Sequence, residues 1–287
     1  MPLTDLVRYL NNQYTKQLPA GRFASRFRVS GDGSAFVHVA NLALESIFLP
    51  ITATASQGIF GHAAALRVYG LSTGNPVSPD AVFVLPADDQ EFVYVDRLVR
   101  TLHTLNYLTH PLRSTLLLKV NRRHVMSVPT DHGLAFEGIL RACGLPPQQI
   151  MLELDADGLK NVDHFTRAVV SYRQRGYGIA LSGFGRSSID LSLLRALQPD
   201  IVKFDRLLLA SAQPLEDLID QIHELGVKVA IEVPNDIQWQ SFIGQTRADL
   251  IQPLLQPIEQ RVSVSIRRQL GTKVDLAGKE FRSLLRP

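Results

Sequence analysis

The stretch from Gly178 to Arg206, GIALSGFGRSSIDLSLLRALQPDIVKFDR, carries most of the information about the fold of this chain. It holds two short apolar runs, Gly178 to Leu181 and Ile201 to Phe204. Between them, from Ile189 to Leu197, apolar residues recur every three or four positions. Short continuous apolar runs are typical of strands buried on both faces, and the wider spacing is typical of a helix. The stretch therefore predicts a strand, a helix and a second strand.

The same alternation extends over most of the chain. Further apolar runs of strand length cover residues 46–51, 64–69, 115–120, 150–154, 227–233 and 250–255. Further helical patterns cover residues 92–108, 133–143, 161–175 and 215–225. Eight strands that alternate with helices predict an α/β fold, a (β/α)8 TIM-like barrel over residues 44–257. We expect an N-terminal helix and turn-rich extension over residues 1–43, and a basic helical extension over residues 258–287.

The composition limits the class of protein. Hydrophobic residues make up 45% of the 287 positions and charged residues 20%, as in an ordinary globular protein. Apolar runs stay well short of the roughly 18 residues of a membrane span, and the N-terminus lacks the features of a signal peptide. We therefore expect a cytoplasmic protein without membrane contact. The net charge of +3 is small and dispersed, so we do not expect nucleic acid as a partner.

Polar residues close the last six of the predicted strands. They are Asn121, Glu153, Ser182, Lys203 with Asp205, Glu232 and Gln252. Active sites of barrels form where the strands end, so these side chains are candidates for a shared site. The pattern predicts a barrel mouth built around something polar. The lone cysteine, Cys143, lies in a helix-end pattern and is predicted to be structural.

Motifs spread over residues 44–257 match one bacterial family in order and spacing. Ser182 to Arg206 follows the family pattern DDFGTGYSSLxxL…(I/V)K(I/F)DR without a gap. Further matches, in chain order, are Pro50-Ile51, Gly61, Leu66-Arg67, Val120-Asn121, Leu152-Glu153-Leu154 and Glu232. By these matches, residues 44–257 resemble the bacterial EAL domain, a cyclic-di-GMP-specific phosphodiesterase on a modified (β/α)8 barrel. The resemblance implies a barrel of the EAL type.

The resemblance also implies that the metal-binding carboxylates of the family have been lost. In the family they hold two divalent cations that activate water. Here the signature Glu is Ala63, and the adjacent pair of aspartates is Ser182 and Gly183. The second acids of two further motifs are replaced by Ala156 and Asn235. We therefore expect no catalytic residue, no bound metal and no phosphodiesterase activity; Mg²⁺ or Mn²⁺ would be expected only if activity were retained.

One alternative alignment, shifted by one residue, places His62 at the signature position, and histidine binds metals. The spacing to Arg67 argues against this shift. Neighbouring residues on a strand face opposite sides, so His62 faces the helices if Ala63 faces the barrel. An active phosphodiesterase with an atypical metal site is thus the least favoured interpretation.

Eight residues remain as candidates for ligand binding: Arg67, Asn121, Glu153, Lys203, Asp205, Glu232, Gln252 and Arg186. The family counterpart of Arg67 contacts a ligand phosphate, and Lys203 and Arg186 are further cations. Structural roles are open alternatives. These are an ion pair between Lys203 and Glu153, a helix cap by Asp205, and satisfaction of loop backbone groups by Asn121.

The sequence favours a catalytically inactive EAL-like domain that regulates cyclic-di-GMP-related signalling by binding a protein partner. A metal-independent cyclic-di-GMP receptor is the alternative, although Leu49 replaces a ligand-contacting glutamine of the family. The terminal extensions are natural places for partner contacts or for a homodimer interface.

Overall fold

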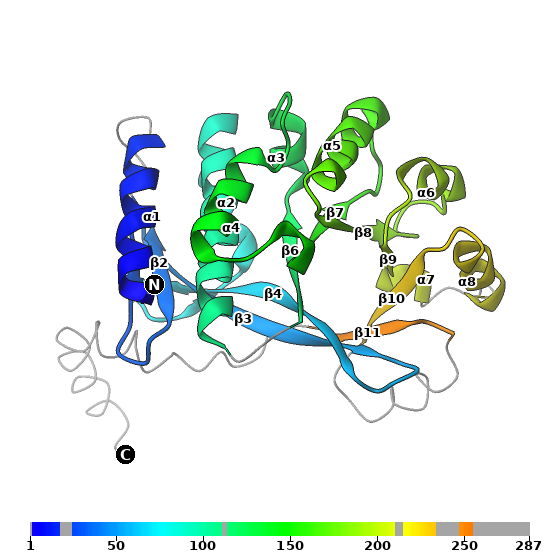
Figure 1. Ribbon diagram of the computed structural model, residues 1–287, viewed down its shortest axis with the longest axis horizontal. Coiled ribbons are helices and arrows are strands. Elements are labelled where there is room, and N and C mark those ends of the chain that lie inside the picture. The colour runs from blue at the N-terminus through cyan, green and yellow to red at the C-terminus, as the bar shows by residue number, and fades with distance from the viewer. Residues whose placement is uncertain (1, 18–24, 111–113, 210–214, 234–246, 255–287) are drawn as a thin grey trace, which may run out of the picture. The chain divides into compact units, whose positions relative to one another are not determined.

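The computed structural model describes residues 2–17, 25–110, 114–209, 215–233 and 247–254. The helices are α1 (Leu3–Gln17), α2 (Asp89–Thr109), α3 (Arg122–Ser127), α4 (Leu134–Cys143), α5 (Val162–Gln174), α6 (Leu191–Leu197), α7 (Arg206–Leu209) and α8 (Leu215–His223). The strands are β1 (Phe27–Val29), β2 (Ala35–Val39), β3 (Leu42–Ala53), β4 (Ile59–Gly70), β5 (Pro76–Val77), β6 (Thr115–Val120), β7 (Ile150–Asp155), β8 (Gly178–Phe184), β9 (Ile201–Phe204), β10 (Lys228–Val233) and β11 (Leu250–Pro253). Figure 1 labels these elements along the chain, apart from β1 and β5.

The chain divides into two compact units. The described part of the first unit lies within residues 1–46 and 66–85, and that of the second lies within residues 47–65 and 86–256. Strands β3 and β4 are long and contribute residues to both units. The predicted division at residues 43 and 257 stays a prediction, and the second of these boundaries falls outside the described residues.

The first unit packs helix α1 against a small antiparallel sheet. Strand β1 pairs with β2, and β2 pairs with the beginning of β3. The Asn11 side chain joins α1 to β1, because it donates to the Phe27 carbonyl over 2.9 Å and accepts from the Phe27 N–H over 2.8 Å. The ring of Tyr14 meets the ring of Phe27 edge-on. The β1–β2 hairpin lies in the segment that the sequence predicts to be turn-rich.

The second unit is a closed barrel of eight strands, which confirms the predicted fold class. The strands follow the order β3, β11, β10, β9, β8, β7, β6, β4 and back to β3. Neighbours from β4 through β11 are parallel, whereas β3 is antiparallel to β11. A tight turn between Ala53 and Gly58 joins β3 to β4. This link is too short to contain a crossover helix, so the first barrel strand runs against the others.

The barrel interior contains an apolar layer to which each strand contributes one side chain. Its members are Ile51, Ala63, Leu117, Met151, Ala180, Ile201, Ala230 and Leu250, all at most 7% exposed. Small and large side chains alternate irregularly around this layer, so it fills as a packed core and leaves no pore. Ala63, at the position of the family's signature Glu, is part of this apolar layer.

A buried ion cluster connects helices α2 and α3 outside the barrel. The Asp96 carboxylate, 3% exposed, lies 2.9 Å from Arg100 Nη2 and 3.1 Å from His124 Nδ1. It also accepts the backbone N–H of Asn121 over 3.1 Å, at the end of β6. Burial raises the pKa of Asp96, but Arg100 and His124 outweigh burial and lower the pKa to about 2. The cluster therefore anchors the end of β6 to the helical layer.

Two short helices, α3 and α7, are absent from the sequence prediction. Each follows directly after a barrel strand and is six residues or fewer in length. Segments of this length complete too few turns to show an apolar periodicity, so the pattern that finds the longer helices cannot find these. Within the described ranges, no helix combines the length and apolar character needed to cross a membrane.

We expect Asp96→Asn to lower the free energy of unfolding at pH 7 by about 3–5 kcal/mol, because Arg100 stays buried without its counter-charge. The folded pKa of Asp96 lies below its ordinary value of 3.8, so its stabilisation is complete above pH 3.8 and is lost as the pH falls towards 2. Urea unfolding should show the gap between wild type and variant narrowing over that interval. The exposed control Asp163→Asn should change stability by less than about 0.5 kcal/mol. Equal stability of Asp96→Asn and wild type at pH 7 would contradict the role of the cluster.

Candidate functional site

The barrel mouth is lined by a polar layer two residues beyond the apolar layer. Side chains two positions apart on a strand share one face, so the residues that follow the apolar layer also face the interior. They include Lys119, Glu153, Ser182, Lys203, Glu232 and Gln252. A hollow of about 460 Å³ opens here, and all but Gln252 of these six line it together with loop residues such as Arg186 and Asp205.

Lys203 is the central cation of this layer. It is 5% exposed, and its Nζ lies 2.8 Å from Glu153 Oε2 and 2.8 Å from Glu232 Oε1. Burial lowers the pKa of Lys203, but the two carboxylates outweigh burial and hold the pKa above its usual value. Burial likewise raises the pKa of Glu153, and Lys203 reverses this to a net lowering. Lys203 and Glu153 are therefore both charged at neutral pH, and Gln252 Nε2 adds a hydrogen bond to Glu232 over 3.1 Å.

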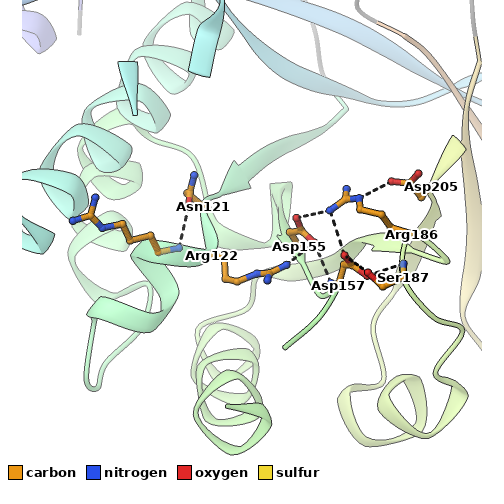
Figure 2. Close-up of polar contacts among 8 residues, drawn as sticks. Asn121, Arg122, Asp155, Asp157, Arg186, Ser187 and Asp205 are labelled. Atoms are coloured by element: carbon orange, nitrogen blue, oxygen red, sulfur yellow. Dashed lines mark hydrogen bonds and ion pairs between the residues drawn. The ribbon is translucent and has the colours of Figure 1, made fainter. Parts of the chain in front are cut away.

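Arg186, on the loop after β8, bridges three aspartates, and we name this group the Arg186 clasp (Figure 2). Its Nη1 lies 3.1 Å from Asp155 Oδ2 and 3.8 Å from Asp157 Oδ2, and its Nε donates to Asp205 Oδ2 over 2.9 Å. Asp155 ends β7, Asp157 follows it in the loop, and Asp205 follows β9. One guanidinium thus ties together the loops that follow three neighbouring strands.

Further contacts support the clasp from either side. Arg122, at the start of α3, places Nη2 3.1 Å from Asp155 Oδ1. The Asp157 carboxylate accepts from the Ser187 backbone N–H over 3.1 Å and from its hydroxyl over 3.0 Å. Burial raises the pKa of Asp155, but the Asp157 N–H and Arg186 outweigh burial and leave the pKa lowered. The aspartates of the clasp are therefore satisfied by groups of the chain itself.

The clasp occupies the space beside Gly183, the residue that the family resemblance assigns to the second aspartate. Gly183 has a φ of +78°, and a Cβ built on it would lie 2.6 Å from Asp155 Oδ1 and 3.0 Å from Asp157 Cβ. Real Cβ atoms essentially never approach other atoms this closely. Ser182, at the first aspartate position, contributes a hydrogen bond to Glu153. Side chains of the chain itself therefore fill the place that an aspartate at residue 183 would need.

The other positions of the family's carboxylates have different surroundings. Ala63 faces the apolar layer, and its neighbour His62 points away from the barrel interior, with Nδ1 2.9 Å from Ser114 Oγ. Ala156 donates its backbone N–H to the Ser182 carbonyl over 3.0 Å. Asn235 lies outside the described residues. Among the residues that the structure describes, no group of three or more His, Cys, Asp or Glu side chains is arranged to hold a metal ion.

Of the other predicted ligand-binding residues, two cap short helices and two have a buried polar atom without a described partner. The Asn121 side chain accepts from the Arg123 N–H over 2.9 Å and so caps α3, and Asp205 accepts from the Leu207 N–H over 3.0 Å at the start of α7. Arg67 lies on the part of β4 that belongs to the first unit, where its buried Nε has no hydrogen-bond partner among the described residues. Gln252 Oε1 is likewise buried without a described partner.

Three residues of the mouth, Lys119, Asp155 and Asp157, are absent from the sequence prediction. A two-residue alternation marks the first two: Lys119 follows Leu117 of the apolar layer, and Asp155 follows Glu153. Asp157 carries no such signal, because it lies in the loop after β7 and only the clasp brings it to the mouth. The family motif points instead to Ala156, one residue away from each aspartate.

A model of the EAL domain family matches residues 37–252 of this chain. The chain belongs to the EAL domain family. Among curated proteins, it is 25% identical over 187 residues to the blue light- and temperature-regulated antirepressor BluF of Escherichia coli K12. That match covers 64% of this chain but only 42% of BluF, so this EAL domain protein spans less than half the length of that relative.

Solved structures share the fold of this EAL domain. The complex of Klebsiella pneumoniae BlrP1 with calcium and cyclic-di-GMP gives a TM-score of 0.63 at 19% identity, over 74% of this chain and 54% of that chain. A standalone EAL protein of Vibrio cholerae O395, bound to cyclic-di-GMP, gives 0.59 at 21% identity, over 73% of this chain and 89% of that chain. The residues at the mouth nevertheless do not fit the two-metal site of the family, because paired and apolar side chains stand in its place.

Gly183→Ala tests whether the space beside Gly183 is filled. We expect a loss of about 1–3 kcal/mol from overpacking against Asp155 and Asp157, added to the roughly 1 kcal/mol that a positive φ costs any residue with a Cβ. Gly158→Ala is the matched control, since Gly158 has a φ of +57° and no atom within 4 Å of the place where its Cβ would lie. Urea unfolding should show a larger loss of stability for Gly183→Ala than for Gly158→Ala. Equal losses would show that the space beside Gly183 has room for a side chain.

Arg186→Gln leaves the three aspartates of the clasp without their shared cation. Because the Arg186 side chain is 42% exposed, we expect a loss of about 1 kcal/mol and not the several kcal/mol of a fully buried charge. The loss should shrink in ~0.5 M salt, which screens the interaction. Arg186→Lys keeps the positive charge but lacks the planar guanidinium, so its free energy of unfolding should lie between those of wild type and Arg186→Gln. Arg167→Gln, at an exposed position of α5, serves as the control. An equal loss of stability in this control would contradict a special role for Arg186.

Proposed function

We propose that this EAL domain is catalytically inactive and works as a protein-interaction module in cyclic-di-GMP-related signalling. One observation carries the proposal: each carboxylate described at the barrel mouth is already paired with a lysine or arginine of the chain. Lys203 pairs with Glu153 and Glu232, and Arg186 pairs with the three aspartates of the clasp. No free carboxylate is left among these residues to hold a divalent cation.

Fixed cations do not replace a metal in hydrolysis. A bound Mg²⁺ or Mn²⁺ both stabilises charge on the phosphodiester and lowers the pKa of a coordinated water, and together these effects contribute several kcal/mol. An ammonium or guanidinium group stabilises charge but has no coordination position for water.

Similarity to BluF supports a regulatory role for the domain. BluF is named an antirepressor, a protein that acts on another protein. The match to BluF covers less than half of BluF, and we propose that this EAL domain likewise acts on another protein. The barrel of the family has been kept here while the mouth has been rebuilt, as expected for a scaffold that binds without hydrolysing.

Hydrolysis of cyclic-di-GMP provides the direct test. We expect purified protein with Mn²⁺ or Mg²⁺ to form no linear product above the protein-free blank, as measured by chromatography. Glu153→Ala should give the same trace as wild type. Turnover by wild type that Glu153→Ala abolishes would falsify the proposal, because it would require a metal at a carboxylate that we assign to Lys203.

A calorimetric titration with cyclic-di-GMP separates the interaction module from a metal-free receptor. We expect no heat of binding at high-micromolar ligand, because carboxylates hold Lys203 and Arg186, which leaves Lys119 and Arg206 as the unpaired described cations of this hollow for two phosphates. Binding that persists in chelator and weakens in Arg67→Ala would instead assign a receptor role, while leaving the absence of hydrolysis intact.

A further inference from the structure

Two hollows meet at Gly183 on the mouth side of the barrel. One is the hollow of about 460 Å³ described above. The other, of about 180 Å³, lies between the loops that precede α5 and α6. Gly183 lines both, and the Arg186 clasp ties together the loops that form their walls. The two hollows are therefore neighbouring parts of one surface.

The smaller hollow is suited to a single apolar side chain. About half of its wall is apolar and comes from Leu159, Val162, Phe184, Leu193 and Leu194, and the polar half includes Asp157, Ser188 and Asp190. A cavity of about 150 Å³ with an apolar lining holds a benzene ring, so this volume suits one leucine or phenylalanine side chain. Val162 is 43% exposed at its edge, and Ile189, on the loop before α6, is 38% exposed.

The acids beside this hollow are already satisfied. Asp190 caps α6 by accepting the Leu193 N–H over 3.0 Å, and its carboxylate also accepts from Ser192 Oγ. Asp157 belongs to the clasp and also accepts from Ser187. Asp157 is paired with Arg186, whereas Asp190 is bonded to neutral donors and keeps its negative charge beside the hollow.

Two cations of the larger hollow form no ion pair with the residues that the structure describes. Lys119 and Arg206 line it, and within the described ranges neither forms a salt bridge. Lys119 affects Glu153 only through its field, which helps to lower the pKa of that carboxyl. Leu207 lies beside Arg206 and is 59% exposed. An entering group therefore meets two available positive charges and an exposed leucine, while the carboxylates of the mouth are occupied.

We propose that these two hollows form one docking surface for a protein segment in which a bulky apolar residue lies close to an aspartate or glutamate. The apolar side chain enters the smaller hollow, and the acid pairs with Arg206 and Lys119. This inference rests on the proposed function and specifies the partner by its chemistry. The clasp holds the walls in place before binding, so little conformational entropy is lost on association.

Selection from a random peptide library displayed on phage tests the surface directly, with the full chain as bait. We expect enriched peptides to carry a leucine or aromatic residue near an acid. Fluorescence anisotropy of a synthesised peptide should then show at least a tenfold loss of affinity for Val162→Ser and for Arg206→Glu. A peptide with its acid changed to lysine should lose binding to wild type and recover it with Arg206→Glu.

The chain offers a matched control for each substitution. Val170→Ser changes another exposed valine of α5, 47% exposed, and Arg195→Glu changes an exposed arginine of α6. Both should bind as wild type does, and thermal unfolding should show that all four variants are folded. Enrichment of basic peptides, failure to enrich any peptide, or equal losses in the controls would overturn the docking surface.

Two further outcomes separate this inference from its rivals. Sedimentation of the chain alone should show no self-association that Val162→Ser or Arg206→Glu abolishes; such self-association would make a second copy the occupant and overturn the proposed partner. Hydrolysis of cyclic-di-GMP by the protein would contradict the proposed function, whether or not peptides bind. Peptides that bind elsewhere on the protein would contradict the docking surface and leave the proposed function in place.

Discussion

The ion pairs that Lys203 and Arg186 form with the acids of the barrel mouth are the constraint on which the rest of the site depends. Five carboxylates converge there from β7, β9, β10 and their loops. Unpaired, they would repel one another and resist burial at a cost of several kcal/mol. Each of these carboxylates instead lies within 3.8 Å of a basic side chain of the chain itself, so each has a counter-charge without any bound ion.

The ion pairs at the mouth connect features of the sequence that lie far apart along the chain. An alanine in the apolar layer, a glycine without room for a side chain and an arginine among three aspartates each look like an isolated substitution in sequence. In the structure, Asp155 and Asp157 occupy the space beside Gly183, and Arg186 pairs with both. A side chain at residue 183 would therefore crowd the clasp.

Much of the fold was predictable because it depends on local patterns. Continuous apolar runs marked the eight barrel strands, and the three-to-four spacing marked the longer helices. The short helices α3 and α7 were missed because they complete too few turns to show a period. The antiparallel course of β3 followed from the tight turn before β4, a feature that counting strands and helices does not reveal. At the site, family spacing located Glu153, Lys203 and Glu232, whereas Asp157 was found only through its contact with Arg186.

The sequence by itself determined the family, the barrel and the residue types at the family's metal-binding positions, because these follow from motifs at known spacings along one chain. Only the tertiary structure decided what surrounds those positions. The aspartate partners of Arg186 come from the ends of two other strands, and no spacing rule relates an arginine after β8 to aspartates after β7 and β9. Charge compensation depends on distances of about 3 Å between segments far apart in sequence, and the closed barrel is what brings those segments together.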